Sequence, residues 1–123
     1  MKSSIFSGLI LSLILIAGIA QATPPDSIKI KLDSTSTLSV TVFHSVKKNP
    51  SDHHIKLITV KLNDVEIIKQ EFQSQTDTKR QDAEYTIIDA KPGDKIVVTA
   101  VCSLFGELTQ VLALPPEKSG GGK

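Results

Sequence analysis

Apolar side chains recur at every second position after residue 23, and this alternation restricts the fold more than any other feature of the chain. In the segments 28–32 and 38–42, Ile, Leu and Val alternate with Lys, Ser and Thr. Successive side chains of a β-strand point to opposite faces, so the pattern is typical of strands with one buried and one solvated face. No segment after residue 23 sustains an apolar repeat at helical spacing. The sequence therefore predicts an all-β domain.

Turn signals separate the alternating segments from one another. Asn63-Asp64 stands between two apolar runs and favours a tight hairpin turn. In Lys91-Pro92-Gly93-Asp94, Pro is second and Gly is third, as a type II turn requires. The polar segment 73–82 is expected to form a loop or a single helical turn.

The strands that these signals delimit are short, and there are about seven of them. Their number, in a domain of about 100 residues, predicts an antiparallel sandwich of immunoglobulin-like architecture. The strands are expected over residues 28–32, 38–43, 55–62, 65–68, 85–88, 95–102 and 107–114.

The first 22 residues have the composition of a cleavable signal peptide. Lys2 supplies the positive charge, the run 5–20 is almost wholly apolar, and Ala20-Gln21-Ala22 forms an A-x-A cleavage site. An uncleaved anchor is the alternative, but the run is shorter than the about 20 apolar residues that span a bilayer. We expect cleavage after Ala22, export to the periplasm or the outside of the cell, and no stable membrane anchor afterwards.

The expected organisation is thus a signal peptide over 1–22, a β-sandwich domain over 23–114 and a flexible Pro- and Gly-rich tail over 115–123. Without residues 1–22, which include Lys2 and no acidic residue, 13 basic and 13 acidic side chains remain. A neutral domain that also lacks Trp offers no basic stripe for phosphates and few aromatic side chains on which bases could stack. Nucleic acid is therefore not expected as a partner.

Cys102 is the only cysteine, so it has no partner for an intramolecular disulfide. In an oxidising compartment an unpaired thiol is protected by burial, by a metal or by a bond to another chain. Each of the three is compatible with the sequence.

The three histidines fall close together in the sequence. His44 ends one predicted strand, and His53 and His54 begin the next. Histidines clustered at one rim of a sandwich, together with a lone cysteine elsewhere at a strand end, offer the imidazole nitrogens and the thiolate that suit a soft metal ion. Because adjacent residues of a strand point to opposite faces, only one of His53 and His54 can readily bind a given ion. The alternative is that all three histidines are solvated in a loop.

The segments 49–60 and 99–106 together resemble the superoxide reductases, the iron-binding domain of desulfoferrodoxins and neelaredoxins. The first contains Asp52-His53-His54-Ile55, where the family has an acidic residue, a His, a His or Tyr, and an Ile. The second contains Cys102-Ser103-Leu104-Phe105-Gly106, where the family has C-N-x-H-G.

The resemblance implies an immunoglobulin-like sandwich with one mononuclear non-haem iron, four equatorial histidines and an axial cysteine. It implies the reduction of superoxide to hydrogen peroxide with an electron from an external donor. His53 matches an equatorial ligand and Cys102 the axial one, whereas Lys47 and Phe105 stand where the family has histidines. We expect the Phe105 ring to be packed, and Asp52 or Glu107 is a further carboxylate ligand to consider.

Two hypotheses follow. In the first, His44 and His54 join His53 and Cys102 around iron, and Lys47 attracts superoxide to an oxidoreductase site. In the second, the sandwich has lost its iron, is not catalytic, and binds a protein or a small ligand at the same rim.

Overall fold

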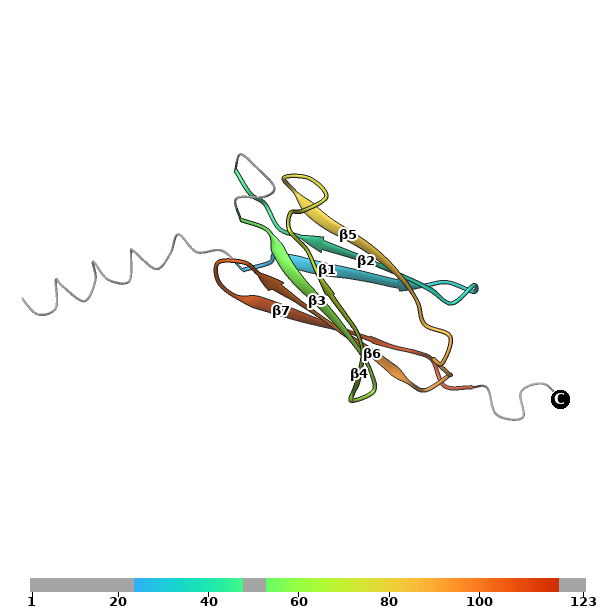
Figure 1. Ribbon diagram of the computed structural model, residues 1–123. Helices are drawn as coiled ribbons and strands as arrows, with labels where there is room; N and C mark the ends of the chain where they lie inside the picture. Colours follow the sequence, from blue (N-terminus) through green and yellow to red (C-terminus); the bar gives the residue numbers. More distant parts are fainter. Residues whose placement is uncertain (1–23, 48–52, 118–123) are drawn as a thin grey trace, which may run out of the picture.

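The computed structural model describes residues 24–47 and 53–117, and within these ranges the regular elements are all β-strands (Figure 1). The prediction of an all-β domain is confirmed. The predicted signal peptide, the loop containing Asp52 and the end of the tail lie outside the described residues. The seven strands are β1 (Ser27–Leu32), β2 (Thr37–Phe43), β3 (Ile55–Leu62), β4 (Val65–Glu71), β5 (Arg80–Thr86), β6 (Lys95–Cys102) and β7 (Glu107–Ala113).

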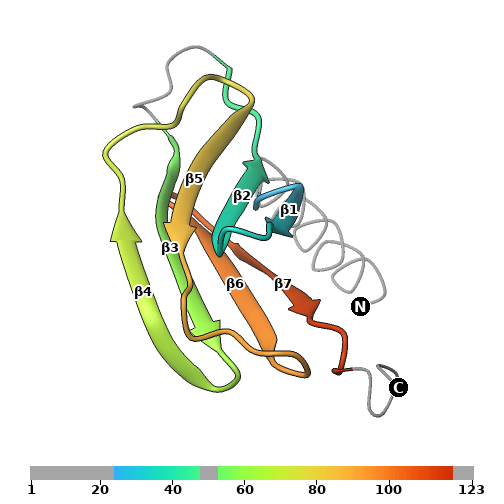
Figure 2. The ribbon, with the colours of Figure 1, turned by 90° about the vertical axis from the view of Figure 1, so that its right-hand side faces the viewer.

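The strands form two antiparallel sheets that enclose one core. One sheet has the order β1-β2-β5 and the other has the order β4-β3-β6-β7. Figure 2 shows the four-stranded sheet with β4 at one edge and β7 at the other. The connections from β2 to β3, from β4 to β5 and from β5 to β6 each pass between the sheets.

The core is built from the inward-facing side chains of both sheets, as the alternation predicts. Full burial of one such aliphatic side chain stabilises the fold by about 1.5–3 kcal/mol. The most buried members, each at most 1% exposed, are Leu38, Val40, Val42, Ile55, Ile58, Val60, Ile96, Val98 and Ala100.

The fifth strand differs from its prediction. The sequence predicts it over 85–88, but it runs from Arg80 to Thr86, so it begins within the segment 73–82 that is predicted to form a loop or a single helical turn. Its inward row begins with Gln81, which is 6% exposed, so the apolar alternation that marks the other strands is missing here. Ile88, counted as part of the strand, lies beyond it and is 75% exposed.

Two turns close the sheets at the end of the molecule opposite the start of β3 (Figure 1). Asn63 has φ 58° in the two-residue β3–β4 turn, a conformation that Asn tolerates better than most residues. Gly93 has φ 89°, and the Asp94 amide donates to the Lys91 carbonyl at 3.0 Å, which is the geometry of the predicted type II turn.

Tyr85 links the two sheets at one side of the sandwich. Its hydroxyl, from β5, donates to the Gln70 side-chain oxygen of β4 at 2.7 Å. Burial of the phenol disfavours the charged phenolate and raises the pKa of Tyr85 to about 12.

This shift predicts the alkaline behaviour of the domain. The unfolded chain loses the phenol proton near pH 10 and the folded chain near 12, so the free energy of unfolding falls as the pH rises through this window. Tyr85 is the only tyrosine and there is no tryptophan, so near-ultraviolet absorbance reports its ionisation alone. We expect a midpoint near 12 for the folded protein and near 10 in urea. Equal midpoints would contradict the burial of the phenol.

Candidate metal centre

Three side chains that can bind a metal ion meet at the end of the sandwich where β3 begins. His44 directly follows β2, His53 lies two residues before the start of β3, and Cys102 is the last residue of β6. One ligand atom from each side chain lies within 4.8 Å of the other two. These three residues are called the HHC cluster below.

The HHC cluster extends the inward-facing rows that form the core. On β2 the row Leu38, Val40 and Val42 is followed, two residues on, by His44, which is 1% exposed. On β6 the buried row ends with Cys102, which is 3% exposed. The period of two that buries the aliphatic side chains therefore directs these two ligands to the same interior.

Backbone contacts hold the segments of His53 and Cys102 side by side. The Ser103 amide donates to the His54 carbonyl at 2.7 Å, and the His54 amide donates to the Ser103 hydroxyl at 3.0 Å. Each contact joins neighbours of the two ligands, so the distance between His53 and Cys102 is set by the main chain as well as by packing.

The loop after Cys102 also orients its sulfur. The Cys102 amide donates to the Gly106 carbonyl at 2.9 Å, and the Leu104 amide lies 3.5 Å from Sγ as a donor. Gly106 has φ 93°, and a Cβ there would come within 2.6 Å of Pro24 Cβ. Only glycine therefore fits this position. A donated N–H stabilises negative charge on sulfur, and the thiolate is the form that binds a metal.

The two imidazoles of the HHC cluster face each other through their Nε2 atoms. The Nε2 atoms of His44 and His53 are 3.1 Å apart, and the rings are perpendicular with centroids 4.6 Å apart. Two imidazole nitrogens bound to one ion at about 2.0–2.1 Å lie roughly 3.0–3.4 Å apart, so this pair fits a shared ion.

The sulfur must move to share an ion with the imidazoles. A nitrogen and a sulfur bound to one ion at tetrahedral angles lie about 3.6 Å apart. The HHC cluster spans up to 4.8 Å. Ion binding therefore requires the sulfur and a nitrogen to approach each other by about 1 Å, which changes in side-chain χ angles supply.

His53 is kept in its neutral form by its surroundings. Burial lowers the pKa of His53, and the nearby His44 and His54 lower it further because two positive imidazoles repel. Neutral imidazole is the form that binds a metal, so this shift widens the pH range in which His53 is available.

His54 points away from the HHC cluster. Its Nε2 lies 3.0 Å from the Phe72 carbonyl oxygen, at the end of β4, so the ring nitrogen donates a hydrogen bond to the main chain. Sequence reasoning placed one of the adjacent histidines on each face, and the structure has His53 in the cluster and His54 outside it.

The other candidate residues lie around the rim. Lys47 is exposed, three residues beyond His44, and Glu107 is exposed at the start of β7. Neither belongs to the HHC cluster. The expectation that Phe105 is packed is wrong: it is 56% exposed, because it lies at the tip of the β6–β7 loop.

Sequence reasoning missed Gln75, which is 5% exposed and contacts the His44 ring. A glutamine in the polar segment 73–82 carries no signal that distinguishes it from solvated neighbours. In the structure the β4–β5 loop packs inward against the segment after β2. There the His44 amide donates a hydrogen bond to the Lys79 carbonyl oxygen at 2.9 Å.

Comparison with models of protein families and with curated proteins finds no match for this chain. In the part of the chain that the structure describes, no helix has the length and apolar character needed to span a membrane.

Replacement of His54 separates its structural role from metal binding. His54→Ala removes the hydrogen bond to Phe72, so we expect the free energy of unfolding to fall by about 1 kcal/mol. Urea denaturation of the metal-free protein measures this change. An unchanged stability would show that the bond contributes nothing.

Proposed function

We propose that the domain is a mononuclear metal-binding protein whose ion is held by His44, His53 and Cys102. The observation that carries this proposal is the convergence of two imidazoles and a thiol within 4.8 Å at the end of the core. Burial also supports it, since His44 and Cys102 are nearly inaccessible to solvent and an ion there would be shielded from competing water.

The donor set limits the kind of ion. Thiolate and imidazole favour copper, zinc and iron, whereas magnesium and calcium prefer oxygen ligands. Iron is the ion that the resemblance to superoxide reductases implies, and His53 and Cys102 are the two positions that match that family. The HHC cluster adds His44, which has no counterpart in the matched motif.

The strand order is compatible with the sandwich that this resemblance implies. In an immunoglobulin-like sandwich the first, second and fifth strands share one sheet, and the third, sixth and seventh share the other. The sheets β1-β2-β5 and β4-β3-β6-β7 fit that arrangement, with the fourth strand paired to the third.

The reaction we propose for the iron-loaded protein is the reduction of superoxide to hydrogen peroxide. The reaction would consume one electron from an external donor and two protons for each superoxide, and bound iron would supply the one-electron chemistry. In this chain His44, His53 and Cys102 would hold the ion, and the thiolate would donate electron density to it. Lys47, exposed near the rim, would raise the local concentration of the anion.

A non-catalytic binding module is the second candidate. Leu104 and Phe105, at the tip of the loop that follows Cys102, are 67% and 56% exposed. Neighbouring exposed apolar side chains are frequent at protein-binding surfaces. In this candidate Cys102 is a packed thiol and the exposed pair contacts a partner protein.

Metal content decides between the two candidates. The mature chain, residues 23–123, is prepared anaerobically, offered iron, copper or zinc, and analysed for bound metal after dialysis. We expect about one ion per chain, lost in Cys102→Ser and His53→Ala and retained in the matched control His54→Ala. The control differs because His54 lies outside the HHC cluster. No bound metal from any of the three would contradict the metal site and favour the binding module.

The reaction is tested separately on the iron-loaded protein. A reductase forms as much peroxide as the superoxide it consumes and releases no dioxygen, because every electron comes from the donor. Dioxygen release, or no acceleration of superoxide loss, would contradict superoxide reduction while leaving the metal site intact.

A further inference from the structure

We propose that Gln75 sets the tautomer of His44, so that the lone pair of its Nε2 is directed at His53 and the ion site. The consequence for metal affinity rests on the proposed function, whereas the tautomer itself is a property of the metal-free protein. Gln75 is a positioning residue in this proposal, since it acts through His44.

Main-chain groups fix the orientation of the Gln75 amide. Its Nε2 donates to the carbonyls of His44 and Asp77, each at 3.0 Å. Its Oε1 accepts the Ile55 amide hydrogen at 3.1 Å. A carbonyl can only accept and a backbone N–H can only donate, so the reversed amide would oppose all three partners.

The fixed amide in turn fixes the His44 ring. His44 Nδ1 contacts Gln75 Oε1, an oxygen that can only accept a hydrogen bond. Nδ1 must therefore be the ring nitrogen that bears the hydrogen. In the neutral ring Nε2 then has its lone pair free, and this atom faces His53 Nε2 at 3.1 Å.

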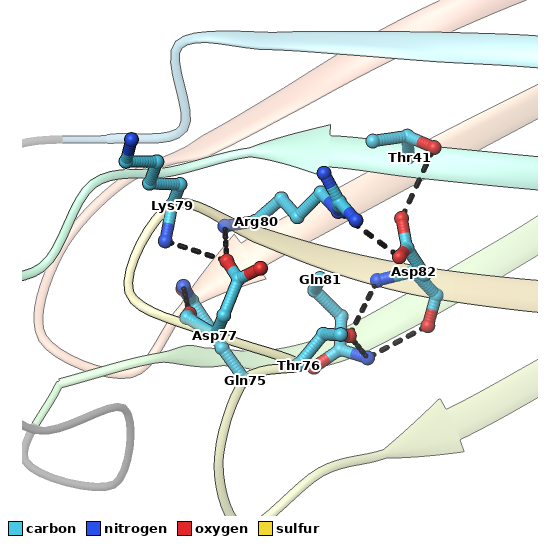
Figure 3. Close-up of polar contacts among 8 residues, drawn as sticks. All are labelled: Thr41, Gln75, Thr76, Asp77, Lys79, Arg80, Gln81 and Asp82. Carbon is cyan, nitrogen blue, oxygen red and sulfur yellow. Dashed lines mark hydrogen bonds and ion pairs between the residues drawn. The ribbon is translucent and has the colours of Figure 1, made fainter.

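The loop that contains Gln75 is itself held in place (Figure 3). The Asp77 carboxylate accepts the amide hydrogens of Lys79 and Arg80 at 2.8 and 3.0 Å. The Thr76 hydroxyl accepts the Asp82 amide at 2.9 Å. These bonds attach the two residues that follow Gln75 to the start of β5 and to the residue before it, which holds the loop in place.

Burial makes the arrangement costly to replace. Gln75 is 5% exposed and His44 is 1% exposed, so water is excluded from most of their polar atoms. A buried polar group that loses its partner costs about 1–3 kcal/mol. The alternative tautomer, with hydrogen on Nε2, would leave Gln75 Oε1 facing an unprotonated ring nitrogen.

The two histidines consequently have unequal roles. Since His44 Nε2 carries the lone pair, the 3.1 Å contact requires the hydrogen to belong to His53 Nε2 in the metal-free protein. A bound ion would take the place of that hydrogen. His44 Nε2 can bind the ion without a change of tautomer, whereas in neutral His53 the hydrogen must pass from Nε2 to Nδ1 before Nε2 can bind.

Nitrogen-15 NMR of the metal-free mature chain tests the tautomer directly, because two-bond proton–nitrogen correlations identify which ring nitrogen is protonated. We expect hydrogen on Nδ1 for His44 and on Nε2 for His53. In Gln75→Met the His44 signals should move toward the Nε2-protonated form. The control Gln81→Met removes another buried glutamine that makes no hydrogen bond to His44, so its spectrum should keep the wild-type tautomer.

Wild-type His44 protonated on Nε2, or an unchanged tautomer in folded Gln75→Met, would overturn the proposal. If Gln75→Met does not fold, the wild-type spectrum alone decides. Metal affinity provides a second measurement. When a histidine that binds a metal loses its hydrogen-bond partner, the metal affinity falls by about 10–100-fold. We expect that loss in Gln75→Met and not in Gln81→Met. A wild-type protein that binds no metal would contradict the proposed function and leave the tautomer result standing.

Discussion

The strict alternation along β2 and β6 is the constraint on which the rest of the structure depends. It buries Leu38 and Val40 on one strand and Val98 and Ala100 on the other, and the same two rows end in His44 and Cys102. A shift of either strand by one residue would turn its whole inward row to solvent. The core and the HHC cluster are therefore set by one register, and the energy that holds the core also positions two of the three ligands.

The end of the core is polar, and a few specific contacts supply partners for the polar atoms of Gln75 and for the His44 ring. Gln75 fills the space beside His44 and makes hydrogen bonds to the His44 ring and to the main chain of three residues. Buried polar networks stabilise a structure only when nearly every member has a partner. This requirement explains why a loop between the two sheets, rather than a strand, completes the site.

Much of the fold could be predicted because it follows from local patterns in the sequence. Strand periodicity gives the all-β class, and strand ends place His44, His53 and Cys102 at one rim. Three features could not be predicted. β5 has a buried glutamine in its inward row, Gln75 comes from a polar loop, and the Phe105 ring is exposed although it is apolar. Each feature depends on contacts between segments that are distant in the sequence. The apolar alternation within one segment gives no information about such contacts.

X-ray absorption spectroscopy of the zinc-loaded chain of residues 23–123 tests most directly whether the HHC cluster is a metal site. We expect one sulfur ligand at about 2.3 Å and two imidazole nitrogens at about 2.0 Å, with the sulfur lost in Cys102→Ser. A first shell of nitrogen and oxygen alone in the wild-type protein would contradict it.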